Sequence, residues 1–289
     1  MDINKKIQAA SHSGASLKVM KKNEKFIVQK TVYESIARNK LAVEKQQRFT
    51  KLLTSSYEIL SIPIDFIDEK PEKLVIKMPY IEGVGGDSMP NKGTRITANN
   101  IKVALNSYLI DALAKSEVKT ISSTIVLNKI QEIEKNTRHN IHLFPSLNYI
   151  ISQLKECCLK DLTLPMGPCH GDLTLSNMKV TQENKLYIFD FLDSFIESPL
   201  QDAAKIIQDM IYGWSFRKEK SSLRLKGQLF CKKAYPNFID TLIQLYPREM
   251  KVLEIMTLLR IAPYIDESDS VTINWFNKSL CKSLKRLEG

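Results

Sequence analysis

A short stretch of the sequence carries polar residues whose types suit chemistry with phosphate and a divalent cation. It reads CHGDLTLSNMKVTQENKLYIFDFLD, and it places His170, Asp172 and Asn177 in one loop, followed by Asp190. A carboxylate such as Asp172 can accept the proton of a hydroxyl group, and amide and carboxylate oxygens suit Mg²⁺. These residue types therefore supply what phosphoryl transfer requires: positioning, neutralisation of charge and an acceptor for the hydroxyl proton.

The elements around this loop are predicted to bring the polar residues together. The apolar runs Met178–Thr181 and Lys185–Phe189 flank the polar turn QEN, which predicts a β-hairpin. Because a hairpin brings its two ends together, we expect Asn177 and Asp190 to lie side by side and to share one Mg²⁺ ion. Asp172 is expected just outside that metal site.

The first eighty residues predict a small lobe built around a sheet. Ser16–Met20 and Phe26–Thr31 form a predicted hairpin, and Tyr33–Leu53 has the periodicity of an amphipathic helix. Ile62–Ile67 and Leu74–Met78 then predict two more strands. We expect residues 1–80 to form a five-stranded sheet with one helix.

Beyond residue 80 the pattern becomes mainly helical. The loop GVGGDSMPNKG, interpreted as flexible, follows Pro79, and we place the boundary between two lobes here, so that the second covers 81–289. A helix is predicted to begin at Ala98, with Thr97 as its cap. The predicted helices are Ala98–Glu117, Ser146–Lys160, Asp202–Tyr212, Pro236–Leu245, Arg248–Leu259 and Thr272–Leu287.

Charge and composition narrow the classes of partner. The chain has 289 residues and a net charge of +10, from 42 Lys+Arg against 32 Asp+Glu, which favours anionic partners. The lysines are scattered and are not interleaved with aromatic residues, so a nucleic-acid groove is not expected. The odd number of cysteines, 5, predicts no disulfide framework, and no zinc-ligand spacing is present. No signal peptide or membrane span is expected, which favours a cytoplasmic protein.

The order of these motifs resembles that of a known enzyme group. His-Gly-Asp-Leu-x-x-x-Asn, then a strand ending in Asp, then SPLQDAAKI, is similar to the aminoglycoside phosphotransferase and choline kinase group, distant relatives of protein kinases. The resemblance implies a two-lobed protein kinase-like α+β fold, with Asp172 as catalytic base and Asn177 and Asp190 as metal ligands. It also implies that His170 anchors the loop and that Asp202 braces it through backbone amides.

The resemblance further implies a nucleotide site in the small lobe. A strand lysine, here Lys30, would reach the phosphates and pair with a helix glutamate, Glu44, with Glu34 as a competing partner. Backbone amides near Ser13 and Ser16 would cradle phosphate.

A hinge between the lobes would hold the purine. Met78 would be the gatekeeper, and the carbonyl of Pro79 and the amide of Ile81 would face the purine edge. Proline has no N–H, but this position needs only an acceptor. The expected cofactors are Mg²⁺ and ATP or GTP as phosphate donor.

The acceptor side is the least defined part of the predicted site. Its arginines and the basic net charge favour a neutral or anionic small molecule, such as a sugar, a sugar phosphate or a polyol. Possible acceptor-site residues are Asp193, Asp209, Trp214, Arg217, Arg260 and Tyr264.

Several alternatives stay open at this point. The acceptor could be an aminoglycoside or a choline-type amino alcohol, because a shared fold does not fix the substrate. A protein kinase is disfavoured because His-Arg-Asp, Ala-Pro-Glu and a Gly-x-Gly-x-x-Gly loop are absent. An inactive nucleotide-binding pseudokinase and a basic nucleic-acid-binding protein are the alternatives from other classes. The sequence does not indicate the oligomeric state.

Overall fold

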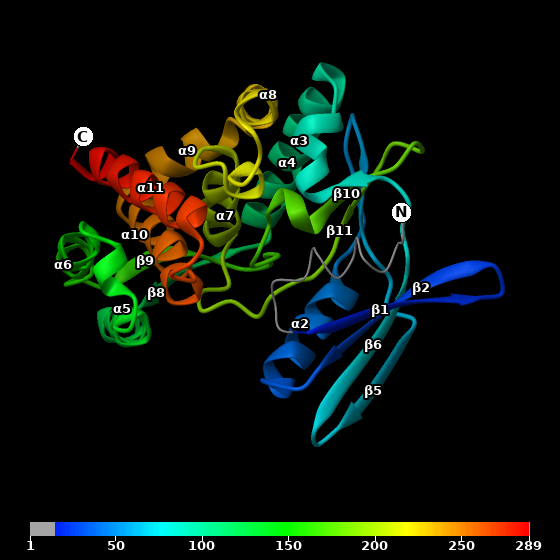
Figure 1. Cartoon of the computed structure of the whole chain (residues 1–289), viewed down its shortest axis with the longest axis horizontal. Coiled ribbons are helices and arrows are strands. Elements are labelled where there is room, and N and C mark those ends of the chain that lie inside the picture. Colours follow the sequence, from blue (N-terminus) through cyan, green and yellow to red (C-terminus); the bar gives the residue numbers. More distant parts are fainter. Residues whose placement is uncertain (1–14, 289) are drawn as a thin grey trace.

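The chain folds into a smaller lobe built on a sheet and a larger helical lobe, as Figure 1 shows. This computed structural model describes residues 15–288. The two-lobed α+β architecture expected from the sequence is confirmed. Within 15–288, no helix has the length and apolar character needed to cross a membrane.

A four-stranded antiparallel sheet forms the smaller lobe. Its strands are β1 (Ser16–Lys22), β2 (Lys25–Val32), β5 (Phe66–Lys70) and β6 (Lys73–Pro79), in the order β1-β2-β6-β5. The predicted first hairpin is present, with Val19 opposite Val28. The expected fifth strand of this sheet is not found within 15–288.

Helix α2 (Ile36–Arg48) packs on the side of this sheet that faces the helical lobe (Figure 1). A small apolar core joins Val43 of the helix to Leu74 and Ile76 of β6. The predicted helix continued to Leu53, which was wrong. The chain leaves the helix at Phe49, whose φ of −63° and ψ of 117° are extended.

A second sheet connects the two halves of the chain. It has five strands in the order β3-β4-β11-β10-β7. The members are β3 (Leu52–Leu53), β4 (Glu58–Ser61), β7 (Val84–Gly85), β10 (Met178–Val180) and β11 (Lys185–Ile188). The hairpin expected from the sequence is confirmed, with Met178 opposite Ile188. Strand β4 pairs in parallel with β11, so the hairpin is held from the N-terminal part of the chain.

The predicted strand Ile62–Ile67 is wrong except for Phe66 and Ile67, which begin β5, because sheet pairing stops between β4 and β5. Pro63 stands in this stretch and has no N–H to donate to a ladder, so the chain passes from one sheet to the other there.

The loop GVGGDS was expected to be flexible, but part of it is the edge strand β7. A Cβ atom at Gly83 would lie 2.4 Å from the carbonyl oxygen of Val180, and one at Gly85 would lie 2.5 Å from that of Met178. These glycines therefore allow β7 to lie directly against β10. Composition alone does not reveal that they are needed for this close approach.

The larger lobe is a bundle of helices around one core. Its helices are α3 (Met89–Lys92), α4 (Arg95–Ala114), α5 (Ser123–Thr137), α6 (Leu147–Cys157), α7 (Pro199–Met210), α8 (Ser221–Ala234), α9 (Phe238–Leu245), α10 (Pro247–Leu259) and α11 (Ser270–Glu288). Strands β8 (Glu117–Ile121) and β9 (Leu162–Met166) pair beside them. Helix α7 is buried along nearly its whole length and packs against α10.

Several features of this lobe differ from the sequence-based prediction, among them the pair of β8 and β9, which was not predicted. Helix α4 begins at Arg95, and Thr94 is its cap, since the Thr94 side chain accepts a 3.1 Å hydrogen bond from the Thr97 amide. Helices α5 and α8 were not predicted. In α8 the apolar residues do not form one clear stripe, because Leu225 and Leu229 are exposed among lysines.

Candidate active site

The loop before the hairpin is anchored by a carboxylate buried in the helical lobe. Ser198 caps α7 and Pro199 opens it, which places Asp202 in the first turn with its side chain toward the loop. Asp202 accepts hydrogen bonds from the amides of His170, at 2.6 Å, and Gly171, at 2.7 Å, and from the Tyr108 hydroxyl, at 2.7 Å. Burial raises the pKa of Asp202, and these hydrogen bonds oppose that effect. The bracing role expected of Asp202 matches this geometry.

His170 joins the loop to the segment after the hairpin. Its Nε2 lies 2.9 Å from the carbonyl oxygen of Phe189, and its Nδ1 accepts the Asp172 amide at 3.2 Å. The Leu192 amide donates to the His170 carbonyl at 2.9 Å, and the ring lies 4.3 Å from that of Phe191. Burial lowers the pKa of His170, which favours the neutral ring, and the hydrogen bonds of His170 join the loop to the segment after the hairpin.

Asp209 is a second buried anchor of the same loop. It accepts hydrogen bonds from the amides of Leu175, at 2.6 Å, and Ser215, at 2.8 Å. Asp209 was predicted on the acceptor side, and this is corrected: its side chain is 1% exposed and is directed at backbone amides. The bond to Leu175 fixes the 3₁₀ turn Leu175–Asn177, and so the position of Asn177.

The three polar groups at the centre of the site are Asp172, Asn177 and Lys205. The Asn177 side-chain amide donates to the carbonyl oxygen of Asp172 at 2.8 Å and to its carboxylate at 3.0 Å. The Lys205 ammonium lies 3.0 Å from the other carboxylate oxygen. Burial would raise the pKa of Asp172, but Lys205 and Asn177 outweigh it and hold the pKa below its ordinary value.

Lys205 was not predicted from the sequence. It lies one turn of α7 after Asp202, and residues at i and i+3 share a helix face. A lysine that follows the bracing aspartate at this spacing is the signal that could have revealed it.

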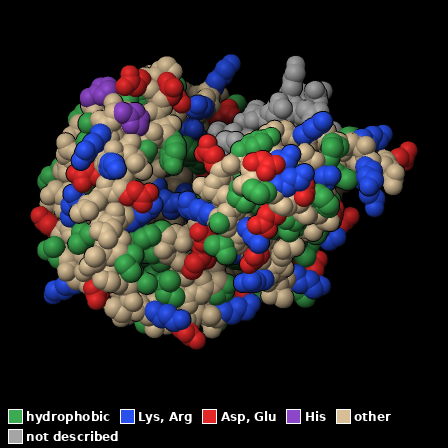
Figure 2. Space-filling view, turned by 90° about the horizontal axis from the view of Figure 1, so that it is seen from below, with side chains coloured by type: hydrophobic (Ala, Val, Ile, Leu, Met, Phe, Trp, Pro, Cys, Tyr) green, Lys and Arg blue, Asp and Glu red, His purple; other side chains and the backbone are tan. Residues whose placement is uncertain are grey.

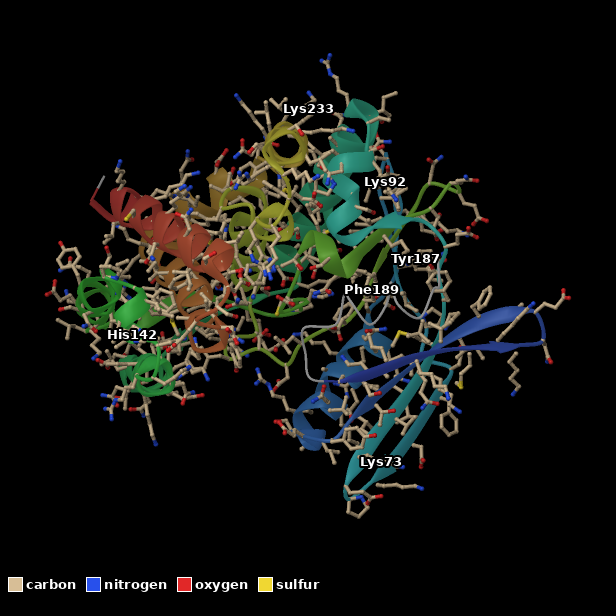
Figure 3. The ribbon with its side chains drawn as sticks, viewed as in Figure 1. Lys73, Lys92, His142, Tyr187, Phe189 and Lys233 are labelled. Carbon is tan, nitrogen blue, oxygen red and sulfur yellow. The ribbon has the colours of Figure 1, made fainter. Side chains whose placement is uncertain are left out.

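Asp190 lies at the end of the hairpin, just after β11. The Phe189 amide donates to the Asn177 carbonyl at 3.1 Å, so the hairpin pairing continues up to Asp190 itself. Asp190 has a φ of 62°, in the left-handed region that aspartate adopts more readily than most residues. Its carboxylate forms an ion pair with Lys30, and its side chain is 44% exposed. Figure 3 labels Phe189 on this stretch, between the two lobes.

Asn177 and Asp190 fit a hard divalent cation. Within 15–288, the Asn177 Oδ1 and the Asp190 Oδ2 accept no hydrogen bond, because the partners of these side chains use their other atoms. One amide oxygen and one carboxylate oxygen are thus open for coordination, and Mg²⁺ needs only one or two protein ligands beside phosphate and water. These two residues would hold Mg²⁺.

The expected partner of Lys30 is corrected. Glu44 lies on another face of α2 and pairs with Arg48 at 3.2 Å, one turn further along the same helix. Glu34 precedes the helix and is exposed. The carboxylate beside Lys30 is that of Asp190, which lies just after β11.

The hinge after β6 is held in place by the hairpin. The Tyr80 amide donates to the carbonyl of Phe26 at 2.9 Å. Lys179 of β10 donates to the Ile81 carbonyl at 2.8 Å and lies 4.7 Å from the centre of the Tyr80 ring. Met78 and Pro79 end β6 just before it. The roles predicted for Met78, Pro79 and Ile81 stay predictions.

Two predicted nucleotide-site residues lie near the start of the chain. Ser16 begins β1, opposite Thr31. Ser13 lies outside the described residues.

The predicted acceptor-site residues fall into different surroundings. The Arg217 guanidinium stacks on Trp214 at 3.6 Å and donates to Thr272 at 3.2 Å, which ties these residues to α11. Tyr264 is 87% exposed. The carbonyl of Asp193 accepts a 2.8 Å hydrogen bond from Arg38.

Arg260 is a predicted acceptor-site residue within electrostatic reach of Asp172. It ends α10 and is half-buried, and within 15–288 its guanidinium has no hydrogen bond or ion pair. Burial and the charge of Arg38 lower the pKa of Arg260, whereas Asp172 raises it, so both groups lie within electrostatic reach. Figure 2 shows Lys and Arg side chains in the hollow between the two lobes.

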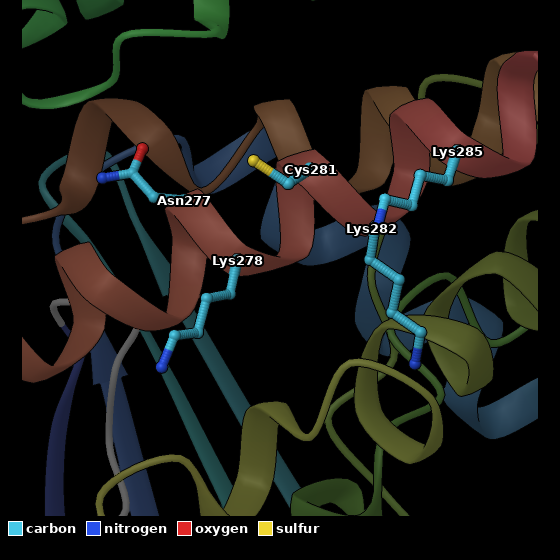
Figure 4. Close-up of a pocket in the computed structure, with 5 residues that line it drawn as sticks. All are labelled: Asn277, Lys278, Cys281, Lys282 and Lys285. Carbon is cyan, nitrogen blue, oxygen red and sulfur yellow. The ribbon is translucent and has the colours of Figure 1, made fainter.

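A separate depression lies on α11 (Figure 4). It has a volume of about 330 Å³ and is lined by Asn277, Lys278, Cys281, Lys282 and Lys285. None of the candidate active-site residues lines it.

Residues 125–246 match the family model described as "Phosphotransferase enzyme family". This span contains the loop before the hairpin, the hairpin and α7, which are the elements that carry the candidate site. The resemblance found in the sequence is thereby confirmed over this region, which is similar to a family of phosphotransferase enzymes. A comparison with curated protein sequences gave no match.

Solved structures share the fold along most of the chain. A choline kinase from Streptococcus pneumoniae is 14% identical with a TM-score of 0.53, covering 94% of this chain and 89% of its own. A putative fructosamine-3-kinase from Haemophilus somnus is 10% identical with a TM-score of 0.51, covering 95% and 89%. An APH(2″) enzyme in complex with GDP and kanamycin is 14% identical with a TM-score of 0.50, covering 94% and 92%.

Proposed function

We propose that this protein transfers the γ-phosphoryl group of a nucleoside triphosphate to a hydroxyl group of a small molecule. The observation that carries the proposal is the hydrogen bond between the side chains of Asn177 and Asp172 on the loop, together with the backbone hydrogen bond from Phe189 to Asn177, which brings residue 190 to the same end of the hairpin as Asn177. A phosphotransferase with this arrangement needs no further reacting group from the protein, because positioning and charge stabilisation supply most of the catalysis.

In the proposed reaction Asp172 orients the acceptor hydroxyl and takes its proton. The hydroxyl oxygen forms a bond to the γ-phosphorus, and the bond to the bridging oxygen breaks, so that its electrons leave with the nucleoside diphosphate. Asn177 and Asp190 would hold Mg²⁺, which would neutralise charge on the phosphates. Lys30, already beside Asp190, is placed to neutralise the non-transferred phosphates. Lys205 keeps Asp172 ionised and therefore able to accept a proton.

The donor is proposed to bind at the hinge, against Met78, Pro79 and Ile81, with backbone near Ser16 toward the phosphates. ATP and GTP both remain candidates. The division into lobes 1–80 and 81–289 is part of this proposal. We also propose a cytoplasmic setting, since all five cysteines are free thiols.

The acceptor is proposed to be a neutral or anionic molecule such as a sugar, a sugar phosphate or a polyol. Lys205 and Arg260 place positive charge around Asp172, and the Arg260 guanidinium is not neutralised by any ion pair within 15–288. A cationic acceptor would meet repulsion there. An aminoglycoside or a choline-type amino alcohol is the alternative, favoured by the fold shared with the choline kinase and the kanamycin-bound enzyme.

A ligand screen followed by a transfer assay tests this function. Sugars, sugar phosphates, polyols, amino alcohols and aminoglycosides are added with Mg²⁺ and a non-hydrolysable nucleotide, and binders raise the melting temperature by mass action. Hits are then tested for transfer of labelled γ-phosphate. Transfer to a neutral or anionic compound supports the proposal, and transfer only to amino compounds supports the alternative. If the nucleotide binds but its γ-phosphate is transferred neither to an added compound nor to water, the result indicates an inactive nucleotide-binding protein.

A further inference from the structure

Helix α2 lies along the segment 190–193 and contacts each of its residues. The contacting side chains recur at helical spacing, so they form one stripe along α2 and its C-terminal end. The contacts join Gln46 to Asp190, Phe49 to Phe191, Lys45 to Leu192 and Arg38 to Asp193. The three polar contacts all go to backbone atoms of the segment, so they fix its path whatever its side chains do.

Gln46 is the contact at the proposed metal ligand. Its side chain is 4% exposed and uses both ends: Oε1 accepts the Asp190 amide at 3.2 Å, and Nε2 donates to the Ile62 carbonyl at 2.8 Å. The left-handed backbone of Asp190 is a conformation that surroundings must hold in place. Gln46 holds it from the side of the smaller lobe.

Lys45 holds the same segment two residues further on. Its ammonium donates to the Leu192 carbonyl at 2.9 Å, pairs with Glu197 at 2.5 Å and lies 3.4 Å from the Cys169 sulfur. Burial would lower the pKa of Lys45, but Cys169 and Glu197 outweigh it and raise the pKa, so the group stays charged. Cys169 directly precedes His170, and Lys45 therefore links α2 to both parts of the site.

Lys30 also contacts this segment. Its ammonium group forms an ion pair with Asp190 and not with a carboxylate on α2. The helix therefore acts on the metal-binding segment directly, through an amide and an ammonium group.

We propose that Gln46 and Lys45 are positioning residues that set the orientation of Asp190, and through it the affinity for the Mg²⁺–nucleotide complex. This inference rests on the proposed function, because it assigns Asp190 to the metal. The chain offers a matched control in Gln47, which is exposed on the same helix.

Binding of a non-hydrolysable ATP analogue, measured by calorimetry with and without Mg²⁺, tests the inference. Gln46→Leu is expected to weaken binding with Mg²⁺ about tenfold, in the range known for residues that orient metal ligands. Binding without Mg²⁺ is expected to be unchanged, and Gln47→Leu is expected to match the wild type in both conditions. A purely structural role of Gln46 would lower the melting temperature without this selective loss.

Lys45 gives a second, independent variant. Lys45→Met is expected to weaken Mg²⁺-dependent binding in the same way, and Lys45→Arg is expected to restore it, because a guanidinium keeps the charge and the donors. This pair decides the question if Gln46→Leu does not fold.

Two failures can be told apart. If the wild type binds the analogue equally well with and without Mg²⁺, the proposed function itself is contradicted. If the wild type depends on Mg²⁺ but the folded Gln46→Leu and Lys45→Met variants match the wild type, the positioning inference is overturned and the proposed function stands.

Discussion

The proposed catalytic loop 170–177 and the proposed metal-binding segment 190–193 are both held through their backbones, but largely from different lobes and with opposite chemistry. The loop is held by buried carboxylates of α7, Asp202 and Asp209, which accept its amide hydrogens. The segment is held largely by donors on α2 that bind its carbonyls, with Gln46 accepting one amide. The loop is therefore part of the helical core, whereas the segment also depends on where the smaller lobe sits.

This difference predicts that substitutions at the loop anchors and substitutions at the segment have different effects on stability and on activity. Loss of a loop anchor should destabilise the whole helical lobe, because unsatisfied amides would remain buried there. Loss of a residue at the segment should affect metal and nucleotide while leaving the core intact. Four substitutions, taken from the largest expected effect to the smallest, can break or sharpen this contrast.

Asp190→Ala removes the exposed carboxylate of the metal-binding segment. We expect turnover to fall by about a thousandfold or more, equivalent to about 4 kcal/mol of barrier, because a metal ligand is lost. The melting temperature should change little. Asp172→Asn is the matched variant on the loop, and it should lower kcat while Mg²⁺-dependent nucleotide binding stays close to that of the wild type. Near-normal turnover of Asp190→Ala would contradict the assignment of the metal site.

Asp202→Asn tests the anchor of the catalytic loop. The amide group can no longer accept both backbone hydrogen bonds, and we expect a loss of about 3 kcal/mol in the free energy of unfolding, since buried unsatisfied groups cost about 1–3 kcal/mol each. Denaturant unfolding measures it, with the surface substitution Asp111→Asn as control. Equal stability of the two variants would show that the anchor is not needed for the fold.

Lys205→Met tests the charge beside the proposed base. Lys205 holds the pKa of Asp172 down against burial, so without it the pKa should rise and the carboxylate should become protonated at higher pH. We expect the acid limb of the kcat/KM profile to move to higher pH, and kcat to fall about tenfold. Lys232→Met, on the exposed face of α8, is the control. An unmoved acid limb would mean that Lys205 does not set the ionisation of Asp172.

Tyr108→Phe removes one hydroxyl from Asp202 and leaves both of its backbone partners. We expect the free energy of unfolding to fall by about 1 kcal/mol, the usual contribution of one hydrogen bond, with turnover nearly unchanged. A larger loss of turnover than of stability would place Tyr108 in the positioning of the loop.

The catalytic loop and the hairpin could be predicted because their signals are local. The turn QEN between two apolar runs predicts the hairpin. Pairing within the hairpin is enough to bring Asn177 close to the residue after Phe189. The α+β class and the two lobes followed from the order of the predicted elements, and the protein kinase-like fold followed from the resemblance. The acceptor side could not be predicted, because the local sequence does not show that Asp209 is buried against backbone amides whereas Arg260 is only half-buried.

Helix α2 shows where sequence reasoning fails in detail. Glu44, Lys45 and Gln46 are consecutive, and each points 100° further around the helix than the one before. The sequence gives no means of choosing which of them faces the site, because the stripe of buried residues is narrow. A carboxylate was expected from the resemblance, and the structure turns the adjacent ammonium and amide inward instead.

The sequence by itself determined the hairpin, the polar residues at its ends and the two-lobed fold, because turns and periodicity act between neighbours along the chain. Only the tertiary structure decided the partners of Lys30, Lys45 and Lys205, each of which pairs with a residue far away or on another element. The physical reason is that a long charged side chain can reach in many directions, and the packing of helix, sheet and loop selects one of them.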